Sequence, residues 1–356
     1  MMDRGGRLES GGARWRAAAL LVIAACGAAC GGGPSDAELT AWRAETEAAN
    51  QAAVAASTHK LADEPGHVLT ISGQTRGGRF SLDWAALGAL ATTHVVTTEP
   101  QDPTRKGVKI DFRGVLVRTL LAKVGAKPEA TEVTFVAIDA FRAPVATADA
   151  QRFDMLLALE ADGKPLPRDQ GGPIFLVHPH STQPETQTLY PDRFWCFYVT
   201  DMIVGTEAAS LTIGDRTLDA AALDALPQHE WTGPVRYKSF WPGAPVLLRG
   251  VLLRDALAAA GAAIPPGGGV TVKGKAAIHH DPRDPRTIVG GAVASCDILL
   301  ATRWAETTGA EPVLIPARLG GPIVLAIPSA CADRLGDPYW ITFVEELVVT
   351  GHRAAP

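Results

Sequence analysis

Hydrophobic residues recur at helical spacing in a short stretch of the chain that ends at a glycine. Leu116, Leu120, Leu121 and Val124 fall on one face of a helix, and Gly125 stands where a left-handed C-terminal cap is expected. Runs rich in β-branched and aromatic residues precede and follow this helix. The order of helices and strands is not the strict alternation of a doubly wound sheet. We therefore expect an α+β fold.

The same reading places the other elements. In the first half the expected strands are His67–Ser72, Glu132–Ile138, Ile174–His178 and Trp195–Val204. The expected helices there are Leu82–Leu90 and Val115–Val124. In the second half the expected strands are Gly269–Val272, Ile323–Ile327 and Trp340–Val349. Binding groups would be carried by the irregular segments Thr98–Lys109, His180–Pro191 and His279–Arg286.

The stretch Phe112–Ala126 is repeated as Leu248–Ala262, with nine of fifteen positions identical at an offset of 136 residues. Other short matches keep the same order: Ser81–Asp83 with Thr217–Asp219, Asp154–Ala158 with Asp297–Ala301, and Gly171–Ile174 with Gly320–Ile323. The segments Ser81–Asp83 and Thr217–Asp219 are each a candidate helix N-cap. A solenoid repeat is far shorter than this period, so we predict two homologous domains in tandem, residues 66–206 and 207–356.

The first 30 residues differ in composition from the rest. Arginines precede the apolar run Ala17–Ala25, which is too short to span a bilayer. The segment Ile23–Cys26 resembles a bacterial lipobox, which implies a signal peptide over residues 1–25 and lipid on Cys26, with Cys30 as the weaker site. A plain cleaved signal or a residual anchor helix is the alternative. We expect an outer-membrane lipoprotein that faces the periplasm, with a partly helical tether over residues 26–65.

Composition and charge exclude several function classes. A chain of 356 residues with 47% hydrophobic content can build two domains, each with its own core. The net charge is -5 without long runs of like charge, so no basic surface for nucleic acid is predicted. Hydrolase and nucleotide-binding motifs are absent from the sequence. The expected partners are the membrane, through the lipid anchor, and a periplasmic redox protein or a small ligand.

The run Asp162–Pro173 carries a family resemblance, together with the Gly-Val-Leu-x-Arg segment before it and the aromatic-rich terminal strand after it. This order resembles the molybdopterin-binding domain of sulfite-oxidase-type oxidoreductases, over most of Leu69–Val204. The resemblance implies the mixed, β-rich sulfite-oxidase fold and a molybdenum–pterin cofactor. The second half matches only through the repeat, because Glu306–Arg318 lacks the run. The cofactor-binding candidates that the resemblance implies are Thr98, Glu99, Arg113, Arg168 and Gln170.

The chain departs from the family's pattern where the cofactor would be held. The family binds molybdenum through a cysteine thiolate in a loop, and the matching segments His94–Pro100 and His229–Pro234 contain no cysteine. Gln170 stands where the family has histidine. Basic positions of the family align with Phe175, Phe197, Val324 and Thr342. The remaining basic candidates, for which helix-surface solvation is the simpler explanation, are Arg113, Arg118, Arg168, Arg249, Arg254 and Arg318.

Because a pterin phosphate needs cationic or amide donors, we expect no bound cofactor. The chain would then be a redox-associated module that binds a ligand or a partner. The alternative is an active molybdopterin-dependent oxidoreductase, in which Thr98 or Glu99 of the first domain faces the metal.

Other side chains leave two interpretations open. Cys296 and Cys331 either form a bridge or remain buried thiols, and we favour thiols, as for Cys196. His279–Asp281 with Asp284 carry possible metal ligands, although solvated loop residues explain them more simply. The pair His178 and His180, held by the proline between them, is most simply an exposed strand end. The aromatic group Trp231, Tyr237, Phe240 and Trp241 would stack on a flat ligand or fill the vacated cofactor cavity; we favour filling.

Overall fold

The computed structural model describes residues 69–351, apart from the gaps 102–104, 168–169, 238–239, 281–285, 307–308 and 336–338. It also describes a few positions before residue 45, of which Ala37, Thr40, Ala41 and Ala44 are helical. The chain separates into two compact units, residues 1–65 and 66–356. The predicted signal peptide, the lipidation site Cys26 and most of the tether lie outside the described residues. None of the described helices has the length and apolar character needed to cross a membrane.

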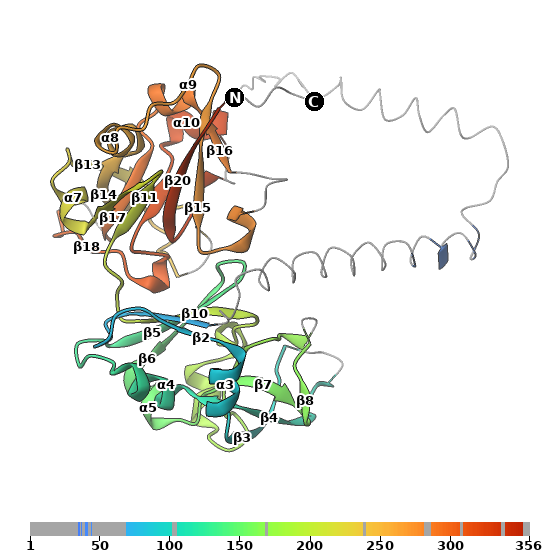
Figure 1. The fold of residues 1–356 in the computed structure, drawn as a ribbon. Coiled ribbons are helices and arrows are strands. Elements are labelled where there is room, and N and C mark those ends of the chain that lie inside the picture. Colours follow the sequence, from blue (N-terminus) through green and yellow to red (C-terminus); the bar gives the residue numbers. More distant parts are fainter. Residues whose placement is uncertain are drawn as a thin grey trace, which may run out of the picture. The chain divides into compact units, whose positions relative to one another are not determined.

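Two five-stranded sheets form the first half of the larger unit (Figure 1). One has the order β2-β1-β10-β5-β6, and the other has the order β3-β4-β7-β8 with β9 also paired to β7. The strands are β1 (Leu69–Gly73), β2 (Phe80–Leu82), β3 (Thr93–Thr98), β4 (Lys109–Leu116), β5 (Glu132–Ala137), β6 (Arg142–Ala146), β7 (Leu156–Ala161), β8 (Lys164–Pro165), β9 (Phe175–Val177) and β10 (Val199–Val204). The helices are α3 (Trp84–Leu90), α4 (Val117–Val124), α5 (Thr147–Arg152), α6 (Glu185–Leu189) and the 3₁₀ turn η3 (Asp192–Phe194).

The second half has the same strand order, β12-β11-β20-β15-β16 in one sheet and β13-β14-β17-β18 with β19 paired to β17 in the other. Its strands are β11 (Ser210–Ile213), β12 (Arg216–Asp219), β13 (His229–Gly233), β14 (Val246–Leu252), β15 (Gly269–Gly274), β16 (Thr287–Val289), β17 (Leu299–Ala305), β18 (Val313–Leu314), β19 (Val324–Ala326) and β20 (Val344–Thr350). Its helices are α7 (Ala220–Asp224), α8 (Leu253–Ala259), α9 (Gly290–Ser295), α10 (Ser329–Leu335) and the 3₁₀ turns η4 (Ala277–His280) and η5 (Ala317–Leu319). The mixed α+β class is confirmed. Descent of the two halves from one duplicated domain stays a prediction.

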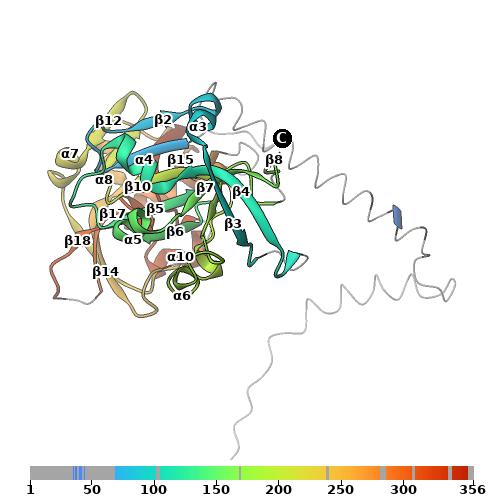
Figure 2. The same cartoon turned by 90° about the horizontal axis from the view of Figure 1, so that it is seen from below.

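Helix positions follow from apolar spacing and capping. Helix α4 buries Val117, Leu120, Leu121 and Val124 and ends at Gly125, whose φ of 61° is left-handed. It lies beside α5, which packs on β5 and β6 (Figure 1, Figure 2). These helices close the apolar core between them and the sheet.

Each predicted capping segment contains the N-cap of a helix, and the capping residue is its aspartate. The side chain of Asp83 accepts a hydrogen bond from Ala86 N at 2.7 Å, and that of Asp219 accepts one from Ala222 N at 2.8 Å. Each cap satisfies a backbone donor that has no partner inside its helix.

Several predicted boundaries were wrong. Val115 and Leu116 belong to β4 and not to α4, because they pair with Leu157 and Leu156 on β7. The segments His94–Pro100 and His229–Pro234, expected as loops, are largely the strands β3 and β13. Strand β10 begins at Val199 and not at Trp195, since Tyr198 has a left-handed backbone with φ of 47°.

The favoured expectation of free thiols at Cys296 and Cys331 was wrong, because the two form a disulfide. Cys296 follows α9 and Cys331 lies in α10, at positions 35 residues apart in sequence. Cys196 is a buried free cysteine whose Sγ lies 3.9 Å from Phe135 O.

Candidate functional site

The end of β3 and the loop after β9 meet in the first half, where the family's metal ligand would be expected. Thr98 N donates to Ser181 Oγ, and Ser181 N donates to Thr97 Oγ1, both at 3.2 Å. Glu99 is 7% exposed, and its carboxylate accepts a hydrogen bond from Gln101 N at 2.7 Å. These contacts are all internal to the protein, so they fix the two segments to one another.

The loop after β9 also carries a buried aromatic group of His178, His180, Tyr190 and Trp195. The ring of His178 stacks on Tyr190 with centroids 5.3 Å apart, and its Nε2 lies 3.0 Å from Phe194 O. Burial lowers the pKa of His178 to about 3 and also lowers the pKa of His180, so both rings are neutral at pH 7. The interpretation of these histidines as an exposed strand end was wrong, because both are buried.

Aromatic side chains fill the positions that align with basic residues of the family. The rings of Phe175 and Phe197 have centroids 4.5 Å apart, and Phe175 also packs on Trp195 at 5.4 Å and on Phe112 at 6.0 Å. A Cβ at Gly171 would stand 2.3 Å from the Phe197 ring, so this position requires glycine. The Gly-Gly-Pro turn therefore packs against aromatic rings. A phosphate bound at this turn would instead need hydrogen-bond donors.

The structure does not bring Arg113 to Thr98 and Glu99. Its Nε donates to Glu160 Oε2 at 2.7 Å, and its Nη1 donates to Ala91 O at 2.6 Å. On the β3–β4 ladder Arg113 faces His94, and Thr98 faces Lys109. Arg113 and Lys109 are four residues apart on β4, a separation of roughly 13 Å along the strand.

The other two candidates are not part of this group either. Gln170 is exposed, and its Oε1 lies 3.5 Å from Arg105 Nη1. Arg168 falls outside the described residues.

A molybdenum–pterin cofactor does not fit the described residues of the first half. No cysteine thiolate lies at the end of β3, and among the described residues no group of three histidine, cysteine or acidic side chains is arranged to hold a metal. Arg113 is bound to Glu160, and the imidazoles of His178 and His180 carry no charge. Of the described basic candidates for the cofactor's phosphate in this region, Arg113 is therefore already engaged and the two imidazoles are neutral.

In the second half the aromatic group Trp231, Tyr237, Phe240 and Trp241 is partly buried against the core. The Tyr237 hydroxyl donates to Ile341 O at 3.0 Å, and Trp241 Nε1 donates to Leu319 O at 2.8 Å. Trp231 packs on Trp340 with centroids 5.5 Å apart. These rings therefore act as packing residues, which agrees with the interpretation that we favoured.

A side chain of the first half reaches the second half's Gly-Gly-Pro turn. Arg142 on β6 is 4% exposed, and its guanidinium carbon lies 5.8 Å from the centroid of the Phe343 ring. A Cβ at Gly320 would stand 3.0 Å from Arg142 Nη1, so the glycine leaves room for the guanidinium. Burial lowers the pKa of Arg142 to about 10, which still leaves it charged at pH 7.

The remaining basic candidates differ in their pairing. Arg118 Nη1 lies 2.6 Å from Asp154, and Arg254 Nη2 lies 2.7 Å from Asp297 at the matching position of the second half. Arg318 Nη1 lies 3.6 Å from Glu132 of the first half. Arg249 has no ion-pair partner in the part of the chain that the structure describes.

The predicted metal ligands of the second half are only partly described. His280 Nε2 lies 2.8 Å from Gly274 O, and burial lowers the pKa of His279 to about 4. Asp281 and Asp284 lie outside the described residues. This metal site stays a prediction.

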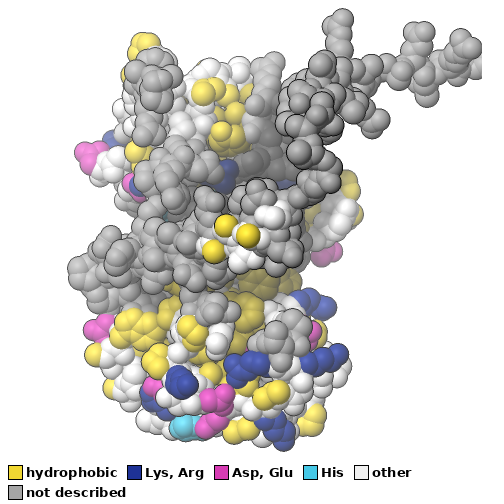
Figure 3. All heavy atoms as spheres, turned by 90° about the vertical axis from the view of Figure 1, so that its right-hand side faces the viewer, with side chains coloured by type: hydrophobic (Ala, Val, Ile, Leu, Met, Phe, Trp, Pro, Cys, Tyr) yellow, Lys and Arg dark blue, Asp and Glu magenta, His cyan; other side chains and the backbone are white. Residues whose placement is uncertain are grey.

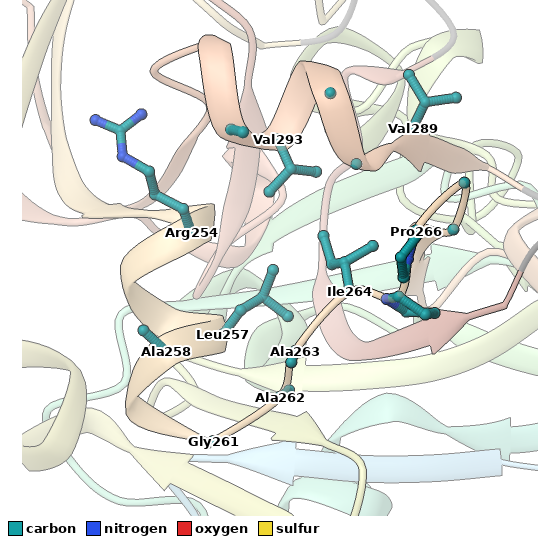
Figure 4. Close-up of a pocket in the computed structure, with 16 residues that line it drawn as sticks. Arg254, Leu257, Ala258, Gly261, Ala262, Ala263, Ile264, Pro266, Val289 and Val293 are labelled. Atoms are coloured by element: carbon teal, nitrogen blue, oxygen red, sulfur yellow. The ribbon is translucent and has the colours of Figure 1, made fainter.

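A cavity of about 820 Å³ opens between α8, α9 and the loop of residues 261–268. Leu257, Ile264 and Val293 point into it, whereas Arg254 extends away from them (Figure 4). The other side chains that line the cavity are apolar. The cavity therefore offers packing surface and no side-chain chemistry.

On the one face that Figure 3 draws, the charge of the described side chains does not single out a site. On this face, lysine and arginine side chains stand among acidic side chains and small hydrophobic areas.

Sequence reasoning missed Ser181, Tyr190 and Arg142, since none belongs to a recognised motif. The repeat was the one sequence signal that could have pointed to these residues, because aligning the two halves at its offset shows at which positions they differ.

Comparison with known proteins now bears on this geometry. Residues 56–183 match the family model of the oxidoreductase molybdopterin binding domain. This segment belongs to that family. The predicted resemblance is therefore confirmed for the segment, and the function of the molybdopterin-binding-type domain is oxidoreductase-related. A search of curated proteins finds no match.

Among solved structures, the sulfane dehydrogenase SoxCD from Paracoccus pantotrophus is similar, with 15% sequence identity and a TM-score of 0.30. The match covers 70% of this chain and 61% of that chain.

Proposed function

We propose that this protein is a lipid-anchored, periplasm-facing module that binds a ligand or a partner beside a redox protein, without cysteine-ligated molybdenum. One observation carries the proposal. Phe175, Phe197 and Trp195 form a packed group of tilted rings at the Gly-Gly-Pro turn, where a bound cofactor would require donors for its phosphate. An aromatic group of this kind supports a scaffold that has lost its cofactor.

The second half supports the same proposal. Its strand order equals that of the first half, which supports a tandem duplication of one molybdopterin-binding-type domain. At its Gly-Gly-Pro turn, Arg142 of the first half lies beside Phe343, and Tyr237 bonds to the backbone nearby. Both turns are therefore occupied by side chains of the protein itself, with Arg142 of the first half contributing to the turn of the second half.

The alternative is an active molybdopterin-dependent oxidoreductase that uses the first domain. The buried carboxylate of Glu99, next to Thr98 at the end of β3, favours it. Such a carboxylate would supply an oxygen ligand in place of the thiolate.

Metal and pterin analysis separates the two functions. The full chain would be made in a host that synthesises the molybdenum cofactor, beside a cysteine-containing member of the family as the control. We expect molybdenum and pterin fluorescence far below one equivalent for this protein and near one equivalent for the control. Stoichiometric molybdenum in this protein would establish the alternative.

The disulfide between Cys296 and Cys331 supports the periplasmic location, because such bonds persist in oxidising compartments. Metabolic labelling with a palmitate analogue tests the anchor. We expect Cys26→Ser to abolish labelling and Cys30→Ser to retain it. Labelling that survives Cys26→Ser would move the anchor to another residue.

A further inference from the structure

On the central strands, two residues face each other at matching places in the two halves, and one of the two has the opposite charge in the second half. In the first half Arg113 of β4 faces Glu160 of β7. In the second half Arg249 of β14 faces Arg303 of β17. Like charges placed directly opposite one another in a ladder destabilise it. The second half therefore concentrates positive charge where the first half neutralises it.

Among the described residues, only one of the two facing arginines has a carboxylate within ion-pair distance. Arg303 Nη2 lies 2.9 Å from Asp224 Oδ2 of α7. Arg249 makes no ion pair or hydrogen bond with any side chain in the described ranges, although Glu230 faces it on β13. Its guanidinium fork is therefore available to a ligand.

The two arginines line a cavity of about 260 Å³ with Asp224, Gln228 and Glu311. The Gln228 amide donates to Leu223 O and Leu226 O, both at 3.0 Å, so its donors are already used. Glu311 is exposed. A cavity of this volume lies just below the range of about 300–1,000 Å³ for ligand pockets, which limits a ligand to a few heavy atoms.

We propose that this cavity binds a small oxyanion, a carboxylate or a tetrahedral anion, through the fork of Arg249 and the second guanidinium of Arg303. A guanidinium presents parallel N–H donors that match two oxygens of such an anion. Asp224 balances the charge of Arg303 and orients it, while Glu311 opposes the anion from the exposed side. The inference goes beyond the proposed function, since it depends neither on the lipid anchor nor on the cofactor.

Isothermal titration calorimetry of the full chain with phosphate, sulfate and malonate tests the site. We expect saturable binding of at least one of them. Arg249→Gln should weaken it by about ten-fold or more, the effect of losing a hydrogen bond to a charged group. The matched control Arg254→Gln removes an arginine of the same half outside this cavity and should leave the affinity unchanged. Equal melting temperatures would show that Arg249→Gln is folded.

A second variant tests whether the negative charge of Glu311 weakens anion binding. Glu311→Gln removes the opposing carboxylate and should tighten binding of the same anion. Binding of malonate alone would assign an organic carboxylate, and binding of phosphate or sulfate would assign a tetrahedral anion. No binding of any probe, an unchanged affinity in Arg249→Gln, or weaker binding in Glu311→Gln would overturn the proposal.

Discussion

The two halves build the same sheets but join equivalent elements by different chemistry. In the first half Arg152 of α5 contacts both carboxylate oxygens of Glu185 in α6 at 2.7 Å. In the second half the disulfide joins the residue after α9 to α10. The first link is exposed and exchanges with water, and the second is covalent. The second half therefore uses a fixed connection where the first half keeps a polar one.

The same contrast holds in the loop that follows β9 and β19. His178 and His180 of the first half match Ile327 and Ser329 of the second half at an offset of 149. The first half thus keeps a buried polar group close to Thr98 and Glu99, and the second half replaces its buried histidine with an aliphatic residue. The buried histidine pair of the loop after β9 has no counterpart at the matching described positions Ile327 and Ser329, so experiments on ligand binding near β3 test the first half.

The largest effect is expected at the ion cluster that ties the halves together. Lys275 is 3% exposed, and its Nζ lies 2.7 Å from Glu345, 3.4 Å from Glu207 and 3.7 Å from Asp201 of the first half. Lys275→Met leaves these carboxylates without their counter-charge, and we expect a loss of about 3–5 kcal/mol in the free energy of unfolding. Urea denaturation of the full chain measures it.

Lys273→Met is the matched control. Its ammonium also pairs with a glutamate, Glu346 at 2.9 Å, but both side chains are about one-third exposed. An exposed pair contributes less than about 1 kcal/mol. If both variants lost the same free energy of unfolding, the stabilisation by the Lys275 ion cluster could not be attributed to its burial.

The disulfide should contribute more than the ion pair that it replaces. The bridge spans 35 residues, which corresponds to about 3–4 kcal/mol of chain entropy in the unfolded state. We expect Cys296→Ala with Cys331→Ala to lower the stability by that amount. Glu185→Gln, at the exposed pair of the first half, should cost less than about 1 kcal/mol.

Thermal unfolding with and without a reductant measures the difference. The reductant should lower the melting temperature of the wild type and leave that of the double variant unchanged. A melting temperature insensitive to reductant in the wild type would mean that the bridge adds no stability.

The buried histidine should make stability depend on pH. The folded pKa of His178, about 3, lies below the unfolded value of about 6.5. Only the unfolded chain binds this proton between those values, so stability is complete above about pH 6.5 and falls with decreasing pH, by about 1.4 kcal/mol per pH unit, down to pH 3. His178→Ile, which installs the residue of the second half, should remove that slope.

His279 provides the comparison within the second half. Its folded pKa of about 4 limits its contribution to the interval between about pH 6.5 and pH 4. Denaturation midpoints of His178→Ile and His279→Gln, measured from about pH 6.5 to pH 3, should therefore diverge from each other below pH 4, where only His178 still contributes. Parallel curves for His178→Ile and the wild type would contradict the burial of a neutral imidazole.

The sequence was sufficient for local features and insufficient for contacts across strands. The capping segments Ser81–Asp83 and Thr217–Asp219 and the left-handed Gly125 were predicted because each acts within its own turn. Strand β3 was expected as a loop, since its alternation is short and its pairing with β4 depends on residues far along the chain.

The candidate site also combines local features that the sequence predicted with long-range contacts that it did not. The Gly-Gly-Pro turn and the aromatic substitutions at Phe175 and Phe197 were visible in the sequence, whereas their packing against Trp195 was not. The contact of Arg142 with the Gly320 turn joins the two halves, and no periodicity within either half encodes it.

The facing pairs on the central strands give the smallest expected effect. A double-mutant cycle of Arg113→Gln and Glu160→Gln should give a favourable coupling, because the hydrogen bond from Arg113 lowers the pKa of Glu160. The cycle of Arg249→Gln and Arg303→Gln should give an unfavourable coupling, on the order of a few tenths of a kcal/mol. A bound anion places negative charge between the two guanidinium groups, so phosphate or malonate should reduce that coupling or reverse its sign. Coupling of the same sign in both ladders, with no response to anions, would mean that strand register does not bring these charges together.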